Sequence, residues 1–232
     1  MREIVLDTET TGMDPAEGDR IIEIGCVELM NHVPTGKTYH VYINPERDVP
    51  AEAVAVHGLT EEFLKDKPVF GEIIGDFHDF MGDATLVIHN AEFDLKFINA
   101  ELAPFGFPAI EWKRVVDTLQ VARKKFPGSP ANLDALCRRF EIDNSERDLH
   151  GALLDAQLLA EVYLELLGGR QHGLGIEREE GSSEGESGED SSALMHKERE
   201  YREARPHAPS EEELIAHQAM IEDLKDPLWK KA

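Results

Sequence analysis

Apolar residues recur at regular spacing along this 232-residue chain up to about residue 168 and become sparse beyond it. Residues 176–192 read IEREEGSSEGESGEDSS, a Gly/Ser/Glu-rich composition that is typical of a flexible, self-repelling linker. Residues 193–232 regain some apolar side chains and a predicted helix at about 210–224, but they are too few and too polar for an independent domain. We therefore expect one folded domain over residues 1–168, a linking segment over 169–192 and a C-terminal segment over 193–232.

The domain reads as a mixed α/β unit. Its first three apolar runs are separated by short gaps and predict an antiparallel meander, and the later ones alternate between helical and strand spacing. A meander followed by such alternation implies a central mixed sheet flanked by helices. The expected strands are 3–8, 20–30, 37–44, 86–89 and 115–116, and the expected helices are 69–81, 93–102, 118–125, 132–140 and 151–167.

The charge balance excludes one common kind of nucleic-acid binder. The chain has 24 Lys and Arg against 47 Asp and Glu, a formal net charge of −23, whereas a protein that coats DNA needs an excess of cations to displace counterions. An anionic membrane surface would repel the chain for the same reason. Residues 1–169 alone hold 31 acids and 15 bases, so the acidity is not confined to the tail. We expect the domain to lack a basic track for long DNA and to grip DNA poorly by itself.

The cysteine count and the hydropathy indicate where in the cell the protein is expected. Cys26 and Cys137 are too few for a disulfide framework or a zinc site, and both lie in apolar patterns, so we expect buried thiols. No uninterrupted apolar run approaches the ~18 residues of a membrane span, and the N-terminus lacks the apolar stretch of a signal peptide. The expected location is the cytoplasm, with no membrane partner.

Two carboxylates stand at the end of the first predicted strand, in DTETTG. Because side chains alternate along a strand, Asp7 and Glu9 point to the same side and repel each other unless a cation lies between them. Oxygen ligands suit Mg²⁺ or Mn²⁺. A third acid, Asp94, follows the strand at 86–89 within HNAEFD, where Asn90 is placed to cap the next helix. Taken singly, the first two could be solvated strand-end acids, and Asp94 could merely complement the helix dipole.

The last acid is harder to explain as a surface residue. In HGALLD, the neighbours of Asp155 one turn away on the predicted helix are small or apolar, so Asp155 points into the packed face. A buried carboxylate needs a cation or strong donors, because its isolated burial costs several kcal/mol or more. His150 falls at or before the helix start, where it could be an ordinary surface residue or lie near the acids. Four acids so placed could hold two divalent ions and hydrolyse a phosphodiester, with His150 accepting the proton of the attacking water.

These motifs resemble those of the DEDDh 3′→5′ exonucleases, a family with an RNase H-like fold. The resemblance implies that the metal ligands are Asp7 and Glu9 of DTETTG, Asp94 of HNAEFD and Asp155 of HGALLD. It also implies that His150 is the general base and that each site binds two Mg²⁺ or Mn²⁺ ions. Three further stretches, NLDALC, FEIDNS and LHGALLDAQLLAEVYL, resemble the proofreading epsilon subunits of bacterial DNA polymerase III.

The epsilon resemblance adds residues that the chemistry alone does not select. It implies that Glu52 and His57, in AEAVAVHGLT, contact the 3′-terminal nucleotide of single-stranded or frayed DNA, together with Asp7, Glu9 and Asp155. Backbone groups of the threonines in DTETTG are expected to line the same pocket, at Thr8, Thr10 and Thr11.

The tail also resembles that of the epsilon subunits. Gln171, Leu174 and Ile176 form a pattern similar to a peptide that binds the beta sliding clamp. Residues 211–229 look like the segment that binds the polymerase alpha subunit. The resemblance leaves open a small third, theta-like subunit, and it implies a cytoplasmic protein that reaches the nucleoid through the replisome.

Two other functions remain open from the sequence. A DEDDh ribonuclease or oligoribonuclease acting alone would have the same acids but usually neither the clamp motif nor the long tail. A clamp-tethered adaptor with an inactive core would not need all five catalytic positions, which are filled here.

Overall fold

The computed structural model describes residues 1–145, 147, 149–169 and 209–223. The chain divides into two units between residues 177 and 178, and each unit is described by itself. The described part of the second unit is helix α8 (Glu211–Asp223), which the sequence predicted at this place. Its first turn is closed by Ser210 and Glu213, whose backbone N–H groups each donate to the other's side chain. No helix among the described residues is long and apolar enough to span a membrane.

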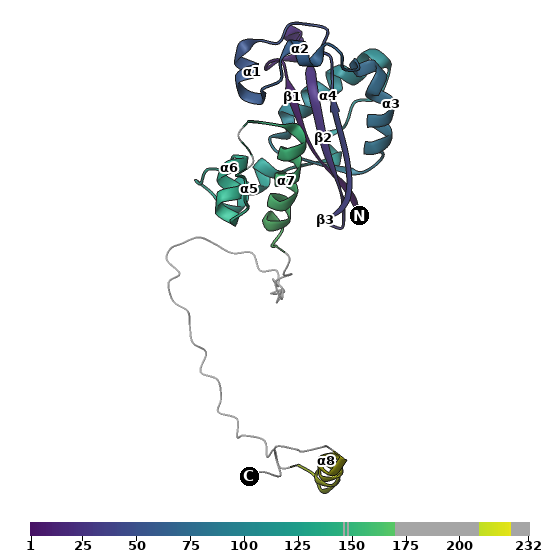
Figure 1. Ribbon diagram of the computed structural model, residues 1–232, viewed down its shortest axis with the longest axis vertical. Helices are drawn as coiled ribbons and strands as arrows, with labels where there is room; N and C mark the ends of the chain where they lie inside the picture. The colour runs from purple at the N-terminus through teal and green to yellow at the C-terminus, as the bar shows by residue number, and fades with distance from the viewer. Residues whose placement is uncertain (146, 148, 170–208, 224–232) are drawn as a thin grey trace, which may run out of the picture. The chain divides into compact units, whose positions relative to one another are not determined.

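The first unit is built on a five-stranded mixed sheet with strand order β3-β2-β1-β4-β5 (Figure 1). The first three strands pair antiparallel, and β4 and β5 run parallel to β1. The sheet and all five of its strands were predicted from the sequence. Their bounds are β1 (Arg2–Thr10), β2 (Ile21–Met30), β3 (Val33–Tyr42), β4 (Thr85–Ile88) and β5 (Val115–Asp117).

Helices cover both faces of the sheet and bury two separate apolar cores. One core joins Ile4 and Leu6 of β1 to α3 and α4, and the other joins Val5 to α5, α6 and α7. These five helices were predicted, with ends that differ by at most two residues. Two short helices, α1 and α2, were not, because they are too brief to show a helical period. The helices are α1 (Ala51–His57), α2 (Glu61–Leu64), α3 (Phe70–Met81), α4 (Ala91–Leu102), α5 (Thr118–Lys125), α6 (Leu133–Phe140) and α7 (Ala152–Leu166), with 3-10 turns at Pro15–Glu17, Ala103–Phe105 and Trp112–Arg114.

One glycine allows α7 to lie directly on the sheet. Gly25 of β2 is the ladder partner of Asp7, and a Cβ at this position would stand 2.2 Å from backbone atoms of Ala152 and Leu153. No side chain fits in that space, so the first turn of α7 is seated against β2. This close approach brings the N-terminal end of α7 beside the carboxyl half of β1. Cys26, the next residue, and Cys137 are buried free thiols, as predicted.

Candidate active site

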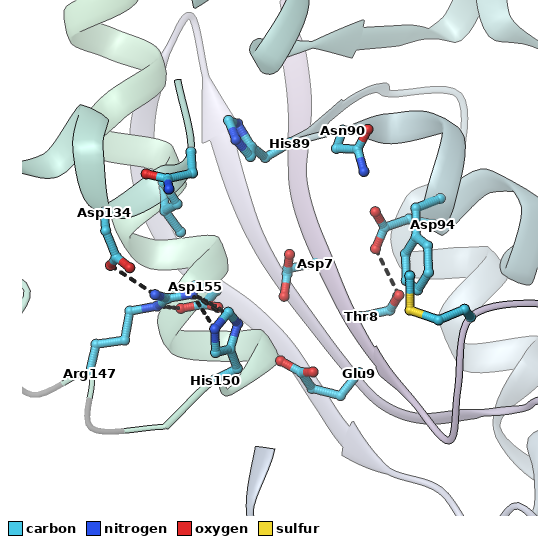
Figure 2. Close-up of a pocket in the computed structure, with 14 residues that line it drawn as sticks. Asp7, Thr8, Glu9, His89, Asn90, Asp94, Asp134, Arg147, His150 and Asp155 are labelled. Atoms are coloured by element: carbon cyan, nitrogen blue, oxygen red, sulfur yellow. Dashed lines mark hydrogen bonds and ion pairs between the residues drawn. The ribbon is translucent and has the colours of Figure 1, made fainter. Parts of the chain in front are cut away.

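The motifs meet in one cavity of about 460 Å³ at the carboxyl end of β1 (Figure 2). Strand alternation turns Val5 toward α7, and it turns Asp7 and Glu9 the same way, whereas Thr8 faces α4. The five residues that the sequence proposed for catalysis all line this cavity. Its lining is Asp7, Thr8, Glu9, Met13, His89, Asn90, Phe93, Asp94, Asn132, Leu133, Asp134, Arg147, His150 and Asp155.

Three carboxylates of this cavity, those of Asp7, Glu9 and Asp94, have raised pKa values. Burial, followed by the charges of Asp94, Glu9 and Asp155, raises the pKa of Asp7 well above its ordinary value. Burial raises the pKa of Glu9 to about 8, with the negative charge of Asp155 as the next cause. Burial also raises the pKa of Asp94 to about 7, although the Thr8 hydroxyl donates a hydrogen bond to it at 2.7 Å. Desolvation and mutual repulsion both disfavour the ionised forms, so the cluster has a high affinity for added positive charge.

Asp94 lies in the first turn of α4, as predicted, but the turn is not closed as the sequence suggested. Asn90 occupies the residue before the helix in a left-handed conformation, with φ 62°, and its side chain makes no capping bond. The left-handed turn directs the Asn90 side chain away from the first backbone amides, so the predicted side-chain cap is wrong. Instead the backbone N–H of Asn90 donates to Asp117 Oδ1 at 3.2 Å. The resulting tight strand-to-helix junction brings Asp94, 3% exposed, to the cavity.

Arg147 is the main residue of the site that sequence reasoning missed. Its Nε and Nη2 donate to the two oxygens of Asp155 at 2.5 and 2.8 Å, and its Nη1 donates to Asp134 Oδ1 at 2.8 Å. The guanidinium is 7% exposed and its pKa is raised, chiefly by the hydrogen bonds to Asp155. The sequence predicted that the buried Asp155 carboxylate needs a cation or strong donors, and in this structure Arg147 is that cation. Nothing in the local pattern around Arg147 distinguishes it from a surface residue.

His150 stands at the cavity mouth, before the first turn of α7. Its backbone N–H donates to the Val56 carbonyl at 3.1 Å, which ties the loop to α1. Its side chain is 49% exposed, and Nδ1 lies 3.5 Å from Asp155 Oδ2 and accepts from Arg147 Nη2 at 3.0 Å. A half-exposed imidazole beside a cluster of acids can exchange protons with solvent and with a group held in the cavity.

A second, more apolar cavity continues from the first and contains the residues that the epsilon resemblance added. The two cavities share Thr8, Glu9, Met13 and Phe93. Its lining is Thr8, Glu9, Thr10, Thr11, Gly12, Met13, Asp19, Pro50, Glu52, Ala53, Val56, His57 and Phe93.

His57, at the end of α1, is a buried polar group that lines this second cavity. Its Nδ1 accepts from the Leu59 backbone N–H at 3.0 Å. Its Nε2 has no hydrogen-bond partner among the described residues. Burial, then the charge of His150, lowers the pKa of His57, so this imidazole is held neutral with one nitrogen available to a ligand.

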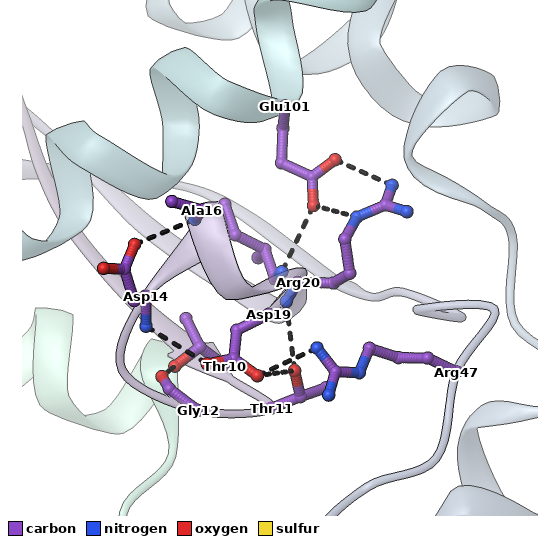
Figure 3. Close-up of polar contacts among 10 residues, drawn as sticks. Thr10, Thr11, Gly12, Asp14, Ala16, Asp19, Arg20, Arg47 and Glu101 are labelled. Carbon is purple, nitrogen blue, oxygen red and sulfur yellow. Dashed lines mark hydrogen bonds and ion pairs between the residues drawn. The ribbon is translucent and has the colours of Figure 1, made fainter.

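A polar network orders the loop between β1 and β2 that forms one wall of the second cavity (Figure 3). Asp19 accepts hydrogen bonds from the Thr11 hydroxyl, the Asp14 backbone N–H and Arg47 Nη1. A Cβ on Gly12 would stand 2.2 Å from an Asp19 oxygen, so this network requires glycine there. The threonines of DTETTG are thereby held at the cavity edge.

The donor atoms of the main cavity fit divalent metal ions. Oxygen atoms of Glu9 and Asp155 and a nitrogen of His150 lie within 4.8 Å of one another, and Asp7 and Asp94 add carboxylates to the same cavity. Such oxygen-rich sets suit Mg²⁺ and Mn²⁺. Burial is the main cause of the raised pKa values, and Arg147 is the one Arg or Lys among the described residues that line this cavity. The proposed clamp-binding residues Gln171, Leu174 and Ile176 lie outside the described residues, as do residues 224–229 of the predicted alpha-binding segment.

Comparison with known proteins places this site in a family. The family model described as "Exonuclease" matches residues 4–163. DNA polymerase III subunit epsilon of Rickettsia conorii is 59% identical over 174 residues, covering 74% of this chain and 76% of that protein. The same subunit of Escherichia coli K12 is 47% identical over 229 residues, covering 95% of this chain and 92% of that protein. The nuclease domain of 3′hExo, a DEDDh family member bound to rAMP, has the same fold, with a TM-score of 0.62 at 20% identity over 72% of this chain and 91% of that one.

The mixed sheet, the converging acids and the family match define a DEDDh-type 3′→5′ exonuclease with an RNase H-like fold. This family is divalent-metal dependent. Within it, the chain belongs to the epsilon subunits of bacterial DNA polymerase III.

Proposed function

We propose that this chain edits the products of a bacterial replicase by removing mispaired nucleotides from the 3′ end of the primer strand. The observation that carries the proposal is the junction of an acidic cavity, lined by Asp7, Glu9, Asp94 and Asp155, with an apolar cavity of nucleotide size. The terminal nucleotide would occupy the apolar cavity, where Glu52 and His57 contact it. Its phosphate would then lie among the four carboxylates.

The four carboxylates would hold two divalent ions, Mg²⁺ or Mn²⁺. When bound, these ions lower the pKa of the attacking water and stabilise the charge that develops on the phosphate and on the leaving 3′ oxygen. The protein's own part is to set the oxygen ligands around the reacting phosphate. Asp7 and Glu9 come from one strand, Asp94 from α4 and Asp155 from α7, so each ligand is anchored on a packed element.

His150 is our candidate for the general base. It is exposed enough to pass a proton on to solvent, and it lies beside Asp155 at the side of the cavity. His57 is a poor alternative, because burial lowers its pKa and it lines the second cavity and not the one that holds the four acids. Selectivity for mispaired ends would arise because a mismatched terminus separates from the template at lower cost than a paired one.

The tail would deliver this acidic domain to DNA. We propose that residues 193–232 bind the polymerase alpha subunit and that Gln171, Leu174 and Ile176 bind the beta sliding clamp, in the bacterial cytoplasm. Leu214, Ile215 and Met220 of α8 are more than half exposed among the described residues, which supports a partner that covers them. A tether raises the effective concentration of primer ends without a basic surface on the domain. A theta-like third subunit is compatible with this arrangement.

The deciding experiment compares hydrolysis of a mismatched primer terminus with that of a matched one, in the presence of Mg²⁺. We expect faster removal of the mismatched nucleotide and almost none by an Asp7→Ala/Glu9→Ala double variant. Undiminished turnover in the variant would rule out the proposed site. A preference for short RNA over single-stranded DNA would instead favour the oligoribonuclease alternative.

The tail assignment has its own test. We expect the full chain to co-elute with a polymerase III alpha subunit in size-exclusion chromatography, and a chain that ends at residue 192 to elute separately while keeping its exonuclease activity. Co-elution of the truncated chain would show that the alpha subunit binds elsewhere.

A further inference from the structure

Positive charge is concentrated in one segment of this acidic domain. Residues 118–140, which form α5, α6 and the turn between them, contain five bases and a single acid. The remainder of residues 1–169 contains ten bases and thirty acids. The two helices both pack on α7 (Figure 1), and the rings of Phe126 after α5 and Phe140 of α6 are in contact. The sequence-based expectation of a domain without a basic track considered only the total charge, and it missed this clustering.

Among the described residues, most bases outside this segment have an acidic partner, and the bases of this segment have none. Seven of the ten other bases in residues 1–169 form ion pairs, namely Arg2, Arg20, Lys37, Arg47, Lys96, Lys113 and Arg147. Within the described part of the chain, none of the five bases of α5 and α6 does so, and all five are exposed. In a domain with a twofold excess of acids, a group of unpaired cations needs an explanation.

Local structure explains two of the five. Lys125 Nζ donates to the Leu166 carbonyl at 2.8 Å and so closes the last turn of α7, and Arg139 lies over the Phe126 ring at 4.3 Å. All five also stand in the last turns of their helices, where a cation complements the helix dipole. That effect does not require several cations on each helix. Arg123, Lys124 and Arg138, which we call the basic patch, make no hydrogen bond or ion pair within the described residues.

The basic patch lies near residues that line the catalytic cavity. Arg138 lies one helical turn beyond Asp134, which lines the cavity together with Asn132 and Leu133. Arg123 lies near enough to His89, another lining residue, for its charge to contribute to the lowered pKa of His89, whose main cause is burial. Figure 2 shows Asp134 across the cavity from Thr8 and Asp94, with His89 between the two sides.

We propose that the basic patch contacts the phosphodiester backbone of the strand being cleaved, on the 5′ side of the scissile phosphate. The proposal rests on the function proposed above. With the terminal nucleotide in the cavity beside α1 and its phosphate among the carboxylates, the rest of the strand leaves past α6 and reaches Arg138 and Arg123. Phosphates are the ligand that isolated, exposed Arg and Lys side chains bind best, through charge and release of counterions. The patch supplies a short basic track on a domain that otherwise repels DNA.

The test compares two double variants that lose the same charge. Arg123→Gln/Arg138→Gln removes patch cations, and Lys37→Gln/Lys113→Gln removes exposed cations from the opposite end of the sheet. Each full-length protein is assayed on single-stranded DNA over a range of salt concentrations. It is also assayed on the nitrophenyl ester of thymidine 5′-monophosphate, which fills the active site but has no upstream backbone.

We expect the patch variant to lose kcat/KM on DNA and to keep the wild-type value on the ester. The slope of log(kcat/KM) against log[salt] should become shallower by about 1.4, since each phosphate contact to a single strand contributes about 0.7. The control variant should match wild type on the ester and retain the wild-type salt slope.

Three results would overturn the proposal. One is a DNA salt slope in the patch variant equal to that of the control, and another is an equal loss on DNA and ester. The third is faster cleavage of DNA by the patch variant, which would indicate that the patch binds the acidic stretch at residues 176–192 instead. Wild-type protein inactive on both substrates would overturn the proposed function itself.

Discussion

The substitution Arg147→Gln tests whether an arginine takes the place of a metal ion in the metal-free site. Arg147 donates two hydrogen bonds to Asp155 and one to Asp134, and the side chains of Arg147 and Asp155 are only 7% and 4% exposed. A divalent ion that binds Asp155 must compete with this guanidinium for the same two oxygens. The substitution should therefore destabilise the metal-free protein and strengthen metal binding at the same time.

The magnitudes follow from the burial of the pair. Removal of one partner from a buried ion pair costs about 3–5 kcal/mol. The lower figure applies here, because the acids of the cavity can take up protons when a cation is lost. For a chain of this size, about 3 kcal/mol lowers Tm by about 6–12 °C. In wild type, a metal that binds Asp155 must displace Arg147, and in the variant it need not. Each ~1.4 kcal/mol of that lost interaction should lower the Kd for the metal about tenfold.

Two measurements check the prediction: thermal unfolding with and without Mn²⁺, and calorimetric titration of Mn²⁺. We expect a lower metal-free Tm, a larger Mn²⁺-induced increase in Tm and a smaller Kd than in wild type. Arg2→Gln is the control, because it removes an ion pair with Glu28 far from the cavity. The control should lower Tm without changing the response to Mn²⁺. A variant of Arg147 with the wild-type metal-free Tm, or with an unchanged Mn²⁺ affinity, would refute the reasoning.

Three further predictions concern the base, the seating of α7 and the acids. His150→Ala should slow hydrolysis by about 10²–10⁴ while Mn²⁺ still binds, and a wild-type kcat would exclude His150 as the base. Gly25→Ala should lower stability by about 1–3 kcal/mol, seen as a lower urea midpoint, and should also lower activity, because the new Cβ would stand 2.2 Å from the backbone of α7. An unchanged midpoint and activity would show that α7 does not lie against Gly25. The third prediction concerns urea unfolding without metal, in which stability should fall as pH rises from about 4.5 to about 8. The folded-state pKa of Glu9 is about 8 against an ordinary 4.5, and that of Asp94 is about 7. Both groups therefore bind protons more tightly in the folded state than in the unfolded one. Saturating Mn²⁺ should weaken this trend, and a metal-free stability that rises over this range would contradict the raised pKa values.

Local patterns predicted much of this molecule correctly. The alternation of side chains along β1 placed Asp7 and Glu9 on one side, and both line the same cavity. The apolar neighbours of Asp155 predicted its burial, and it is 3% exposed. These predictions succeed because strand and helix periods depend only on nearby residues.

The errors come from interactions that link distant segments. Asn90 has the residue type of a helix cap, but the left-handed turn that joins β4 to α4 directs its side chain away from the helix. Arg147 was missed because only its contacts with Asp155 and Asp134 distinguish it from a surface residue.

The sequence by itself determined the class of fold, the acids and the histidine of the site, and their resemblance to a family of exonucleases. Residue type and short-range spacing carry that information, because a carboxylate offers oxygen ligands in any fold. Only the tertiary structure decided how those groups meet. Gly25 lets α7 lie against the sheet, and that contact brings Asp155 near Asp7, where Arg147 pairs with it. The strength of such contacts depends on distance and burial in space, which spacing along the chain does not encode.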